Sequence, residues 1–240
     1  MTQKVTTNPT SRDFEGVCTF LRSRSILPES PRASQIATAK KIHAATYSLL
    51  LWRFRLRPSE LHRRVFVEEL ASDALQILPQ ALMAFNKATK LLNRSIVENV
   101  FRHIYFADHP VEFKRMHLDR KWYVPMATLK DYAKTHPLFQ VTESKFGAIS
   151  SLIRLYSELS EGVHGSRVED LEMRVALQKI TFHEKSFARH AKSVEKTTEA
   201  TNFVLAAFHN AQFRKFAVED RRIVLRTMPP KARQVLLHLE

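Results

Sequence analysis

The chain has 240 residues, 44% of them hydrophobic, and a formal net charge of +14 at pH 7. This length and hydrophobic content predict a folded globular protein of one large domain, with or without an appendage. The single cysteine, Cys18, excludes an intrachain disulfide framework and leaves too few thiols for a structural zinc site.

Glycine content and turn sequences favour an all-α fold. Only four glycines stand against ten prolines, and no Asn-Gly or Asp-Gly turn links alternating apolar residues, as β-hairpins usually require. The N-terminus lacks the apolar run of a secretory signal. The most apolar helical segment, residues 44–52, is far shorter than the roughly 20 residues that span a bilayer. We therefore expect a cytoplasmic protein without a membrane segment.

The positive charge favours a polyanionic partner, because clustered Lys and Arg displace counterions from phosphates. Nucleic acid is the first candidate. An acidic partner protein, an anionic membrane surface or a simple solvated surface are the alternatives. Both ends of the chain are basic whereas its middle is nearly balanced, so we expect the ends to dock and the middle to carry any chemistry.

The first half of the chain predicts a disordered lead-in over residues 1–12, followed by a short helix over residues 14–22. Ser30 and Pro31 then form a helix start signal, and the helix that follows is expected to end near Arg55, before Pro58.

A second long helix is expected after Ser59, with Pro79 kinking or interrupting it. A third should cover residues 91–107 and a fourth should run from Thr142 to Gly165.

The last region predicts a long helix over residues 181–214, followed by two short helical segments over residues 218–228 and 229–239. The expected organisation is therefore a lead-in, a helical bundle domain over residues 13–215 and a C-terminal helical hairpin over residues 216–240. The fold class is an all-α bundle of long antiparallel helices.

Charged side chains stand within two otherwise apolar helical segments, residues 93–109 and 153–165. Burying such groups costs several kcal/mol unless each finds a partner, so they either pair with one another or line a site. Metal-ligand motifs, phosphate-binding glycine loops and a nucleophile elbow are all missing, so no metal or cofactor is expected. Metal-independent acid–base chemistry by His and Arg, of the kind that cleaves RNA, remains.

The segment from Arg102 to His109 resembles the motif of Arg, four to six residues, then His of the HEPN-like all-α superfamily, many of whose members are ribonucleases that dimerise. The chain also resembles, over about residues 40–210, a bacterial family of uncharacterised helical proteins. That family carries an Arg-x-x-x-Glu helix, here Arg94 and Glu98, and a later Tyr-x-x-Leu-Ser-x-x-x-His segment, here Tyr156 to His164.

These resemblances imply an RNA-acting homodimer, free or in a defence or toxin complex with a partner protein. Three arginines would hold phosphate, two histidines would be alternative proton carriers, Glu98 would orient an arginine and Ser160 would donate a hydrogen bond. The candidate catalytic residues are Arg94, Glu98, Arg102, His109, Arg154, Ser160 and His164.

Structural roles remain open for the same residues. Arg94 and Glu98 could simply pair at i,i+4, and His164 and His109 could be helix-end residues. Arg154 could reach Glu98 as a buried salt bridge, and Tyr156 is expected in the core. The rival function is a non-catalytic basic helical adaptor that binds nucleic acid or a partner protein.

Overall fold

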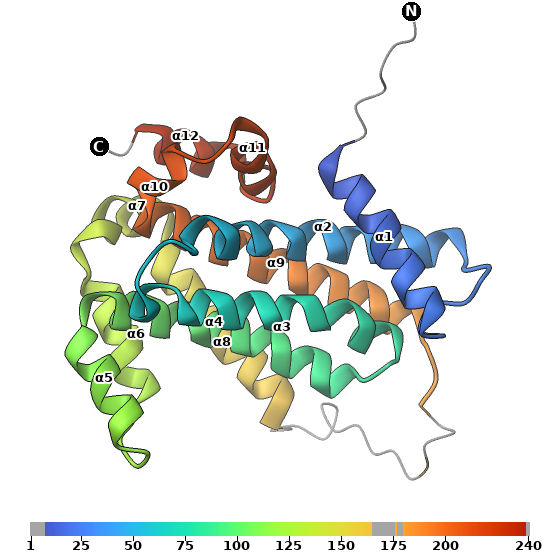
Figure 1. The fold of residues 1–240 in the computed structure, drawn as a ribbon, viewed down its shortest axis with the longest axis horizontal. Coiled ribbons are helices and arrows are strands. Elements are labelled where there is room, and N and C mark those ends of the chain that lie inside the picture. The colour runs from blue at the N-terminus through green and yellow to red at the C-terminus, as the bar shows by residue number, and fades with distance from the viewer. Residues whose placement is uncertain (1–7, 165–175, 177–179, 239–240) are drawn as a thin grey trace, which may run out of the picture.

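The computed structural model describes residues 8–164, 176 and 180–238, and within these ranges it contains helices and no strand (Figure 1). The all-α prediction is confirmed. The α-helices of the described residues are α1 (Pro9–Ser23), α2 (Ala33–Leu56), α3 (Val65–Leu82), α4 (Asn86–Asp108), α5 (Pro110–Leu118), α6 (Met126–Thr135), α7 (Gln140–Phe146), α8 (Ala148–His164), α9 (Glu184–Phe208), α10 (Asn210–Arg214), α11 (Val218–Arg226) and α12 (Pro230–His238). Short 3₁₀ turns at Leu61–Arg63 and Pro137–Phe139 complete them.

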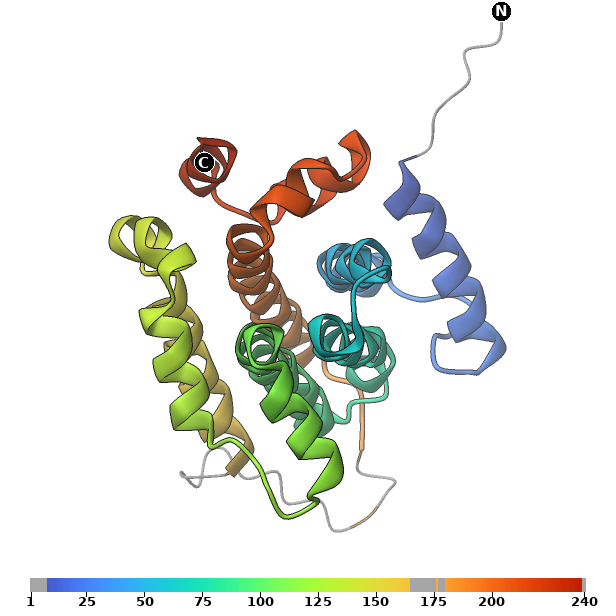
Figure 2. The ribbon, with the colours of Figure 1, turned by 60° about the vertical axis from the view of Figure 1, so that its left-hand side comes forward.

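Five long helices, α2, α3, α4, α8 and α9, form the bundle, and each runs opposite to the one before it (Figures 1 and 2). Helix α9 packs against α2, α4 and α8. It runs parallel to α2, because Ser34 bonds Glu184 near the start of both helices and Ser48 bonds Asn202 further along. The last long helix therefore fills the space that the earlier ones surround.

A buried polar network joins α2, α9 and the C-terminal helices. The side chain of Asn202 is fully buried; its Oδ1 accepts from Trp52 Nε1 at 2.9 Å. Its Nδ2 donates to Ser48 Oγ at 2.7 Å and to Thr227 Oγ1 at 3.0 Å. Buried polar groups need such partners, so this network fixes the register of α2 on α9 and attaches the end of α11.

The chain's last two helices, α11 and α12, contact α2 and α9 respectively. No helix in the described residues has the length and hydropathy to cross a membrane.

Local sequence explains where the helices break. Gly147 adopts the left-handed conformation with φ of 58°, and its N–H donates to the Glu143 carbonyl at 2.8 Å, which ends α7. The Glu143 carboxylate then accepts the N–H groups of Ile149 at 2.7 Å and Ser150 at 3.2 Å. One acidic side chain thus caps the start of α8 across the glycine.

Several predicted boundaries differ from the structure. The helix expected from Thr142 to Gly165 is two helices, divided at Gly147, and that expected over residues 181–214 is α9 followed by α10. Residues 9–12, expected in the lead-in, belong to α1, because the Asn8 side chain accepts the Thr10 N–H and Pro9 needs no donor partner there. Pro79 does not interrupt α3, which continues for one more turn to Leu82.

Candidate functional site

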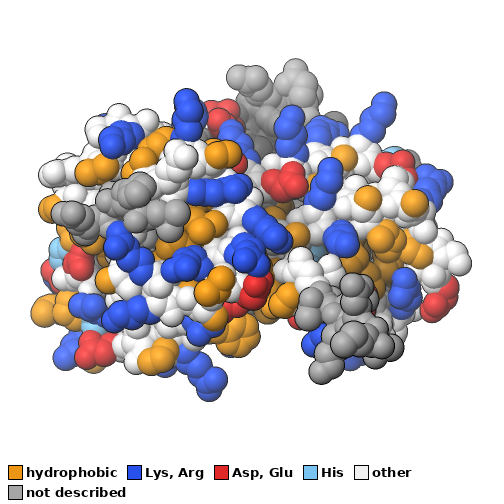
Figure 3. Space-filling model, turned by 90° about the horizontal axis from the view of Figure 1, so that it is seen from above, with side chains coloured by type: hydrophobic (Ala, Val, Ile, Leu, Met, Phe, Trp, Pro, Cys, Tyr) orange, Lys and Arg blue, Asp and Glu red, His pale blue; other side chains and the backbone are white. Residues whose placement is uncertain are grey.

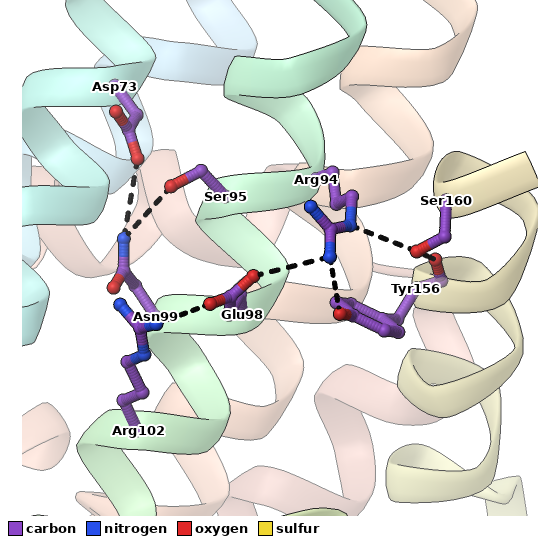
Figure 4. A network of polar contacts seen from close by, with 8 residues as sticks. All are labelled: Asp73, Arg94, Ser95, Glu98, Asn99, Arg102, Tyr156 and Ser160. Carbon is purple, nitrogen blue, oxygen red and sulfur yellow. Dashed lines mark hydrogen bonds and ion pairs between the residues drawn. The ribbon is translucent and has the colours of Figure 1, made fainter. Parts of the chain in front are cut away.

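The guanidinium of Arg94 lies between α4 and α8 and contacts side chains of both (Figure 4). Its Nε donates to Ser160 Oγ at 3.0 Å and its Nη2 donates to Tyr156 Oη at 2.7 Å. The same Nη2 lies 3.7 Å from Glu98 Oε2, and the guanidinium carbon is 5.0 Å from the centre of the Tyr156 ring. Three side chains from two helices therefore hold this cation in one place.

Glu98 joins two arginines along one face of α4. Its other carboxylate oxygen accepts from Arg102 Nη2 at 2.5 Å. The side chains of Arg94 and Glu98 are 22% and 19% exposed, whereas that of Arg102 is 43% exposed. Arg102 can thus present its remaining donors to solvent, while Arg94 is committed to the protein. We call Arg94, Glu98, Arg102, Tyr156 and Ser160 the arginine network.

Helix α6 adds a further cation to the network, because Lys130 Nζ lies 5.3 Å from the centre of the Tyr156 ring. Tyr156 therefore carries a cation on its ring and a hydrogen bond at its hydroxyl, and it is partly exposed rather than fully buried. Tyr156 was expected in the core, and it also contacts Arg94. The four-residue spacing from Tyr156 to Ser160, which puts both side chains on one face of α8, is the sequence feature that indicates this contact.

Two predicted site residues lie elsewhere. Arg154 is 70% exposed and lies 3.9 Å from Glu158 on a different face of α8, so the expected buried bridge from Arg154 to Glu98 is absent. His109 follows the last residue of α4, with Nδ1 2.7 Å from the Tyr105 carbonyl oxygen and its ring stacked on Tyr105 at 4.1 Å. It stands 15 residues beyond Arg94, about 22 Å along the helix axis, which is too far for the two side chains to share one phosphate.

His164 is the last residue of α8, one helical turn after Ser160. Its side chain lies outside the described residues. The structure therefore brings together Arg94, Glu98, Arg102 and Ser160 from the predicted set, and it ends α8 at His164.

A buried layer flanks the arginine network on α4. Asn99 Nδ2 lies 3.4 Å from Asp73 Oδ2 and 3.3 Å from Ser95 Oγ (Figure 4). Burial raises the pKa of Asp73, while the hydrogen bonds from Ser95 and Asn99 oppose that rise. This layer links α3 to α4 and backs the network.

Sequence reasoning missed a pair of buried histidines where α4 meets the end of α9. The Nε2 atoms of His103 and His209 are 2.7 Å apart, and the two residues are 0% and 8% exposed. Burial lowers the pKa of His209 to about 4 and lowers that of His103 well below its ordinary value, with the neighbouring charges contributing less. Both rings are therefore neutral at pH 7, and one donates its N–H to the other.

Beside this pair, Asp108 accepts hydrogen bonds from two residues. Its Oδ2 accepts from the Tyr132 hydroxyl at 2.9 Å and lies 2.9 Å from His136 Nε2. Because His136 Nδ1 accepts the Leu138 N–H at 3.2 Å, the ring donates through Nε2 to the carboxylate. Burial and Asp108 raise the pKa of Tyr132 to about 12. These contacts tie α6 to the end of α4.

No family model, curated protein or solved structure matches this chain. The geometry of its own residues must therefore carry the functional argument.

The described residues contain no group of three or more His, Cys, Asp or Glu side chains that could hold a metal ion. What the arginine network offers is fixed positive charge near the surface. Seen from above, Lys and Arg side chains are also spread over the face that carries α1, α2 and α11 (Figure 3). Such an arrangement can bind oxyanions.

Proposed function

We propose that this protein is a HEPN-like RNA-acting protein that binds RNA phosphate at Arg102 beside the fixed Arg94 and cleaves the RNA without a metal ion. The observation that carries this proposal is the arginine network itself. Arg94 is held rigidly by Tyr156 and Ser160, while the neighbouring Arg102 keeps donors exposed. Pre-positioned cations of this kind stabilise charge that develops on a phosphate.

The chemistry would be an attack of the ribose 2′-oxygen on the adjacent phosphorus. The 2′-hydroxyl proton passes to a base, the bond from phosphorus to the 5′-oxygen breaks, and that leaving oxygen receives a proton. Histidine suits proton transfer near neutral pH, and Arg102 suits the charge on the phosphorane. His164, one turn after Ser160, is the proton carrier of this proposal, and Glu98 orients Arg102.

The resemblance that motivates the proposal also implies a homodimer, working in the cytoplasm alone or in a defence or toxin complex. In such a dimer each copy would supply one set of these residues. The net charge of +14 supports a polyanionic substrate.

The test is cleavage of end-labelled single-stranded RNA in the presence of a metal chelator. Wild type should cut, whereas His164→Ala and Arg102→Ala should lose activity by 100-fold or more while remaining folded, the loss expected from removing one proton carrier or one oxyanion donor. Lys114→Ala removes one positive charge at an exposed residue of α5, outside the network, and is the matched control that should retain activity. Absence of cleavage by wild type, or equal activity in all variants, would contradict catalysis.

A basic helical adaptor is the second candidate, favoured by one observation. The Nε and Nη2 groups of Arg94 already bond Ser160, Tyr156 and Glu98, as expected for a clamp between helices. If His164→Ala lowers thermal stability, RNA binding persists and no cleavage is detected, the adaptor is supported. Binding that does not change with salt would contradict both candidates.

A further inference from the structure

Three adjoining hollows form a continuous trough beside α9. The first, about 830 Å³, lies between the start of α9 and the loop before α2. It shares Ser186 and Arg189 with the second, about 460 Å³, between α4, α8 and α9. The second shares Leu155 and Lys196 with the third, about 230 Å³, which reaches Phe203. From Glu184 to Phe203 the trough follows α9 for about 28 Å.

Positive charge dominates the lining of this trough. Its basic side chains are Arg32, Lys90, Arg154, Lys185, Arg189, Lys192 and Lys196, against the acidic Glu158, Glu184 and Glu199. Glu184 is already bonded by Ser34 at 2.8 Å and paired with Arg32, and Glu158 is paired with Lys196 at 2.6 Å. Arg32 and Lys196 are thus each paired with a carboxylate, and the seven cations still outnumber the three acidic side chains, so the lining carries a net positive charge.

Four of the basic residues form a stripe on α9 itself. Lys185, Arg189, Lys192 and Lys196 follow one another at intervals of four, three and four residues, and all four are exposed. At 3.6 residues per turn, they fall within an arc of about 60° and extend about 16 Å along the axis. Like charges placed this close destabilise a helix slightly, so a ligand that neutralises them binds favourably.

Apolar side chains floor the trough between the charges. Phe182 lies in the first hollow, Leu155 and Leu159 in the second and Phe146 in the third. Leu155 and Leu159 are buried, whereas Phe182 and Phe146 are partly exposed. A cationic groove with such aromatic side chains suits a single-stranded nucleic acid, whose phosphates meet the cations and whose bases stack on the rings.

A larger hollow, about 1110 Å³, lies between α1, α2 and α11, but its charges nearly cancel. Its basic residues Arg12, Arg222 and Arg226 face Asp13 and Glu219. The α9 trough is the more strongly cationic of the two.

We propose that the trough along α9 is the binding track that leads single-stranded RNA to the arginine network. This inference rests on the proposed function, since it assigns the track for the same substrate. Leu159 lines the trough, whereas the next residue, Ser160, bonds Arg94. Only the width of α8 therefore separates the track from the network, and Lys90 precedes Arg94 by one turn of α4.

The test measures binding of a fluorescent 12-nucleotide RNA by anisotropy over a range of salt concentrations. Arg189→Glu combined with Lys192→Glu should weaken binding more than 10-fold and reduce the salt slope by about 1.4, at about 0.7 for each lost phosphate contact on a single strand. Lys114→Glu combined with Lys134→Glu changes two exposed lysines on α5 and α6 by the same total charge and should bind within about twofold of wild type.

A second readout is independent of mutation. Bound RNA should protect Lys192 and Lys196 from an acylating reagent, as measured by mass spectrometry, while Lys114 and Lys134 react as before. If wild type binds RNA but the trough variant matches the control variant, or if the trough lysines are not protected, the track is overturned and the proposed function stands. If wild type does not bind RNA at all, the proposed function fails and the track fails with it.

Discussion

The Arg94→Ala substitution tests how much the arginine network contributes to the fold. The change removes the hydrogen bonds to Ser160 and Tyr156, each worth about 1 kcal/mol at this partly exposed position, and an i,i+4 pair with Glu98 worth about 0.4 kcal/mol. Glu98 retains Arg102 as a partner, so no charge is left unpaired. The free energy of unfolding should fall by about 2.5 kcal/mol.

For a protein of this size, that loss corresponds to a decrease in Tm of about 5–10 °C. The assay is thermal and urea unfolding followed by circular dichroism. Tyr156→Phe removes one of the hydrogen bonds, and the double-mutant cycle of the two changes should give a coupling energy of about 1 kcal/mol.

Arg102→Ala is the matched control, because its half-exposed side chain pairs with Glu98 at the surface and contributes less than about 1 kcal/mol. Equal Tm values for Arg94→Ala and Arg102→Ala would refute the reasoning, as would a coupling energy near zero between Arg94 and Tyr156.

Three further outcomes are expected. The pKa values of His103 and His209 are lowered in the folded state, so the free energy of unfolding should be highest above the unfolded pKa of about 6.5. It should decrease as the pH falls toward 4, by up to about 2.7 kcal/mol per pH unit for the two groups together. In urea titrations, His209→Gln should roughly halve this slope, and an unchanged slope would contradict the assignment. Asn202→Ala should lower the free energy of unfolding by about 3 kcal/mol, because the buried Trp52 N–H loses its acceptor. Urea unfolding followed by tryptophan fluorescence measures this loss, and a much smaller loss would contradict the prediction. Gly147→Ala should lower the free energy of unfolding by about 1–2 kcal/mol through the positive φ alone, since the added Cβ meets atoms no nearer than 3.8 Å. Gly147→Asn should lower it less, and equal Tm values for both variants and wild type would count against this.

Helix existence was predictable because it follows from apolar periodicity, but breaks within helices were not. Pro79 carries a standard interruption signal, yet it stands only one turn before the end of α3, where its effect is small. Gly147 was overlooked because one glycine in an apolar pattern is often tolerated, whereas here Glu143 supplies the cap that makes the break favourable. Such a cap depends on three-dimensional placement.

The candidate site was predictable where residues share a helix face. The four-residue spacing of Arg94, Glu98 and Arg102 gave their pairing directly. The spacing of Arg154 and Tyr156 also predicts that Arg154 lies away from the network, because residues two apart lie on nearly opposite sides of a helix. The meeting of His103 with His209 could not be foreseen, since 106 residues separate them and the contact depends on how α4 crosses α9.

The central position of α9 has a consequence for biosynthesis. The space between α2, α4 and α8 is filled by residues up to Phe208, so a nascent chain that has only just released α8 from the ribosome lacks the helix that contacts all three of them. Contacts so distant in sequence form late. We expect the nascent chain to acquire full protease resistance only once α9 has emerged.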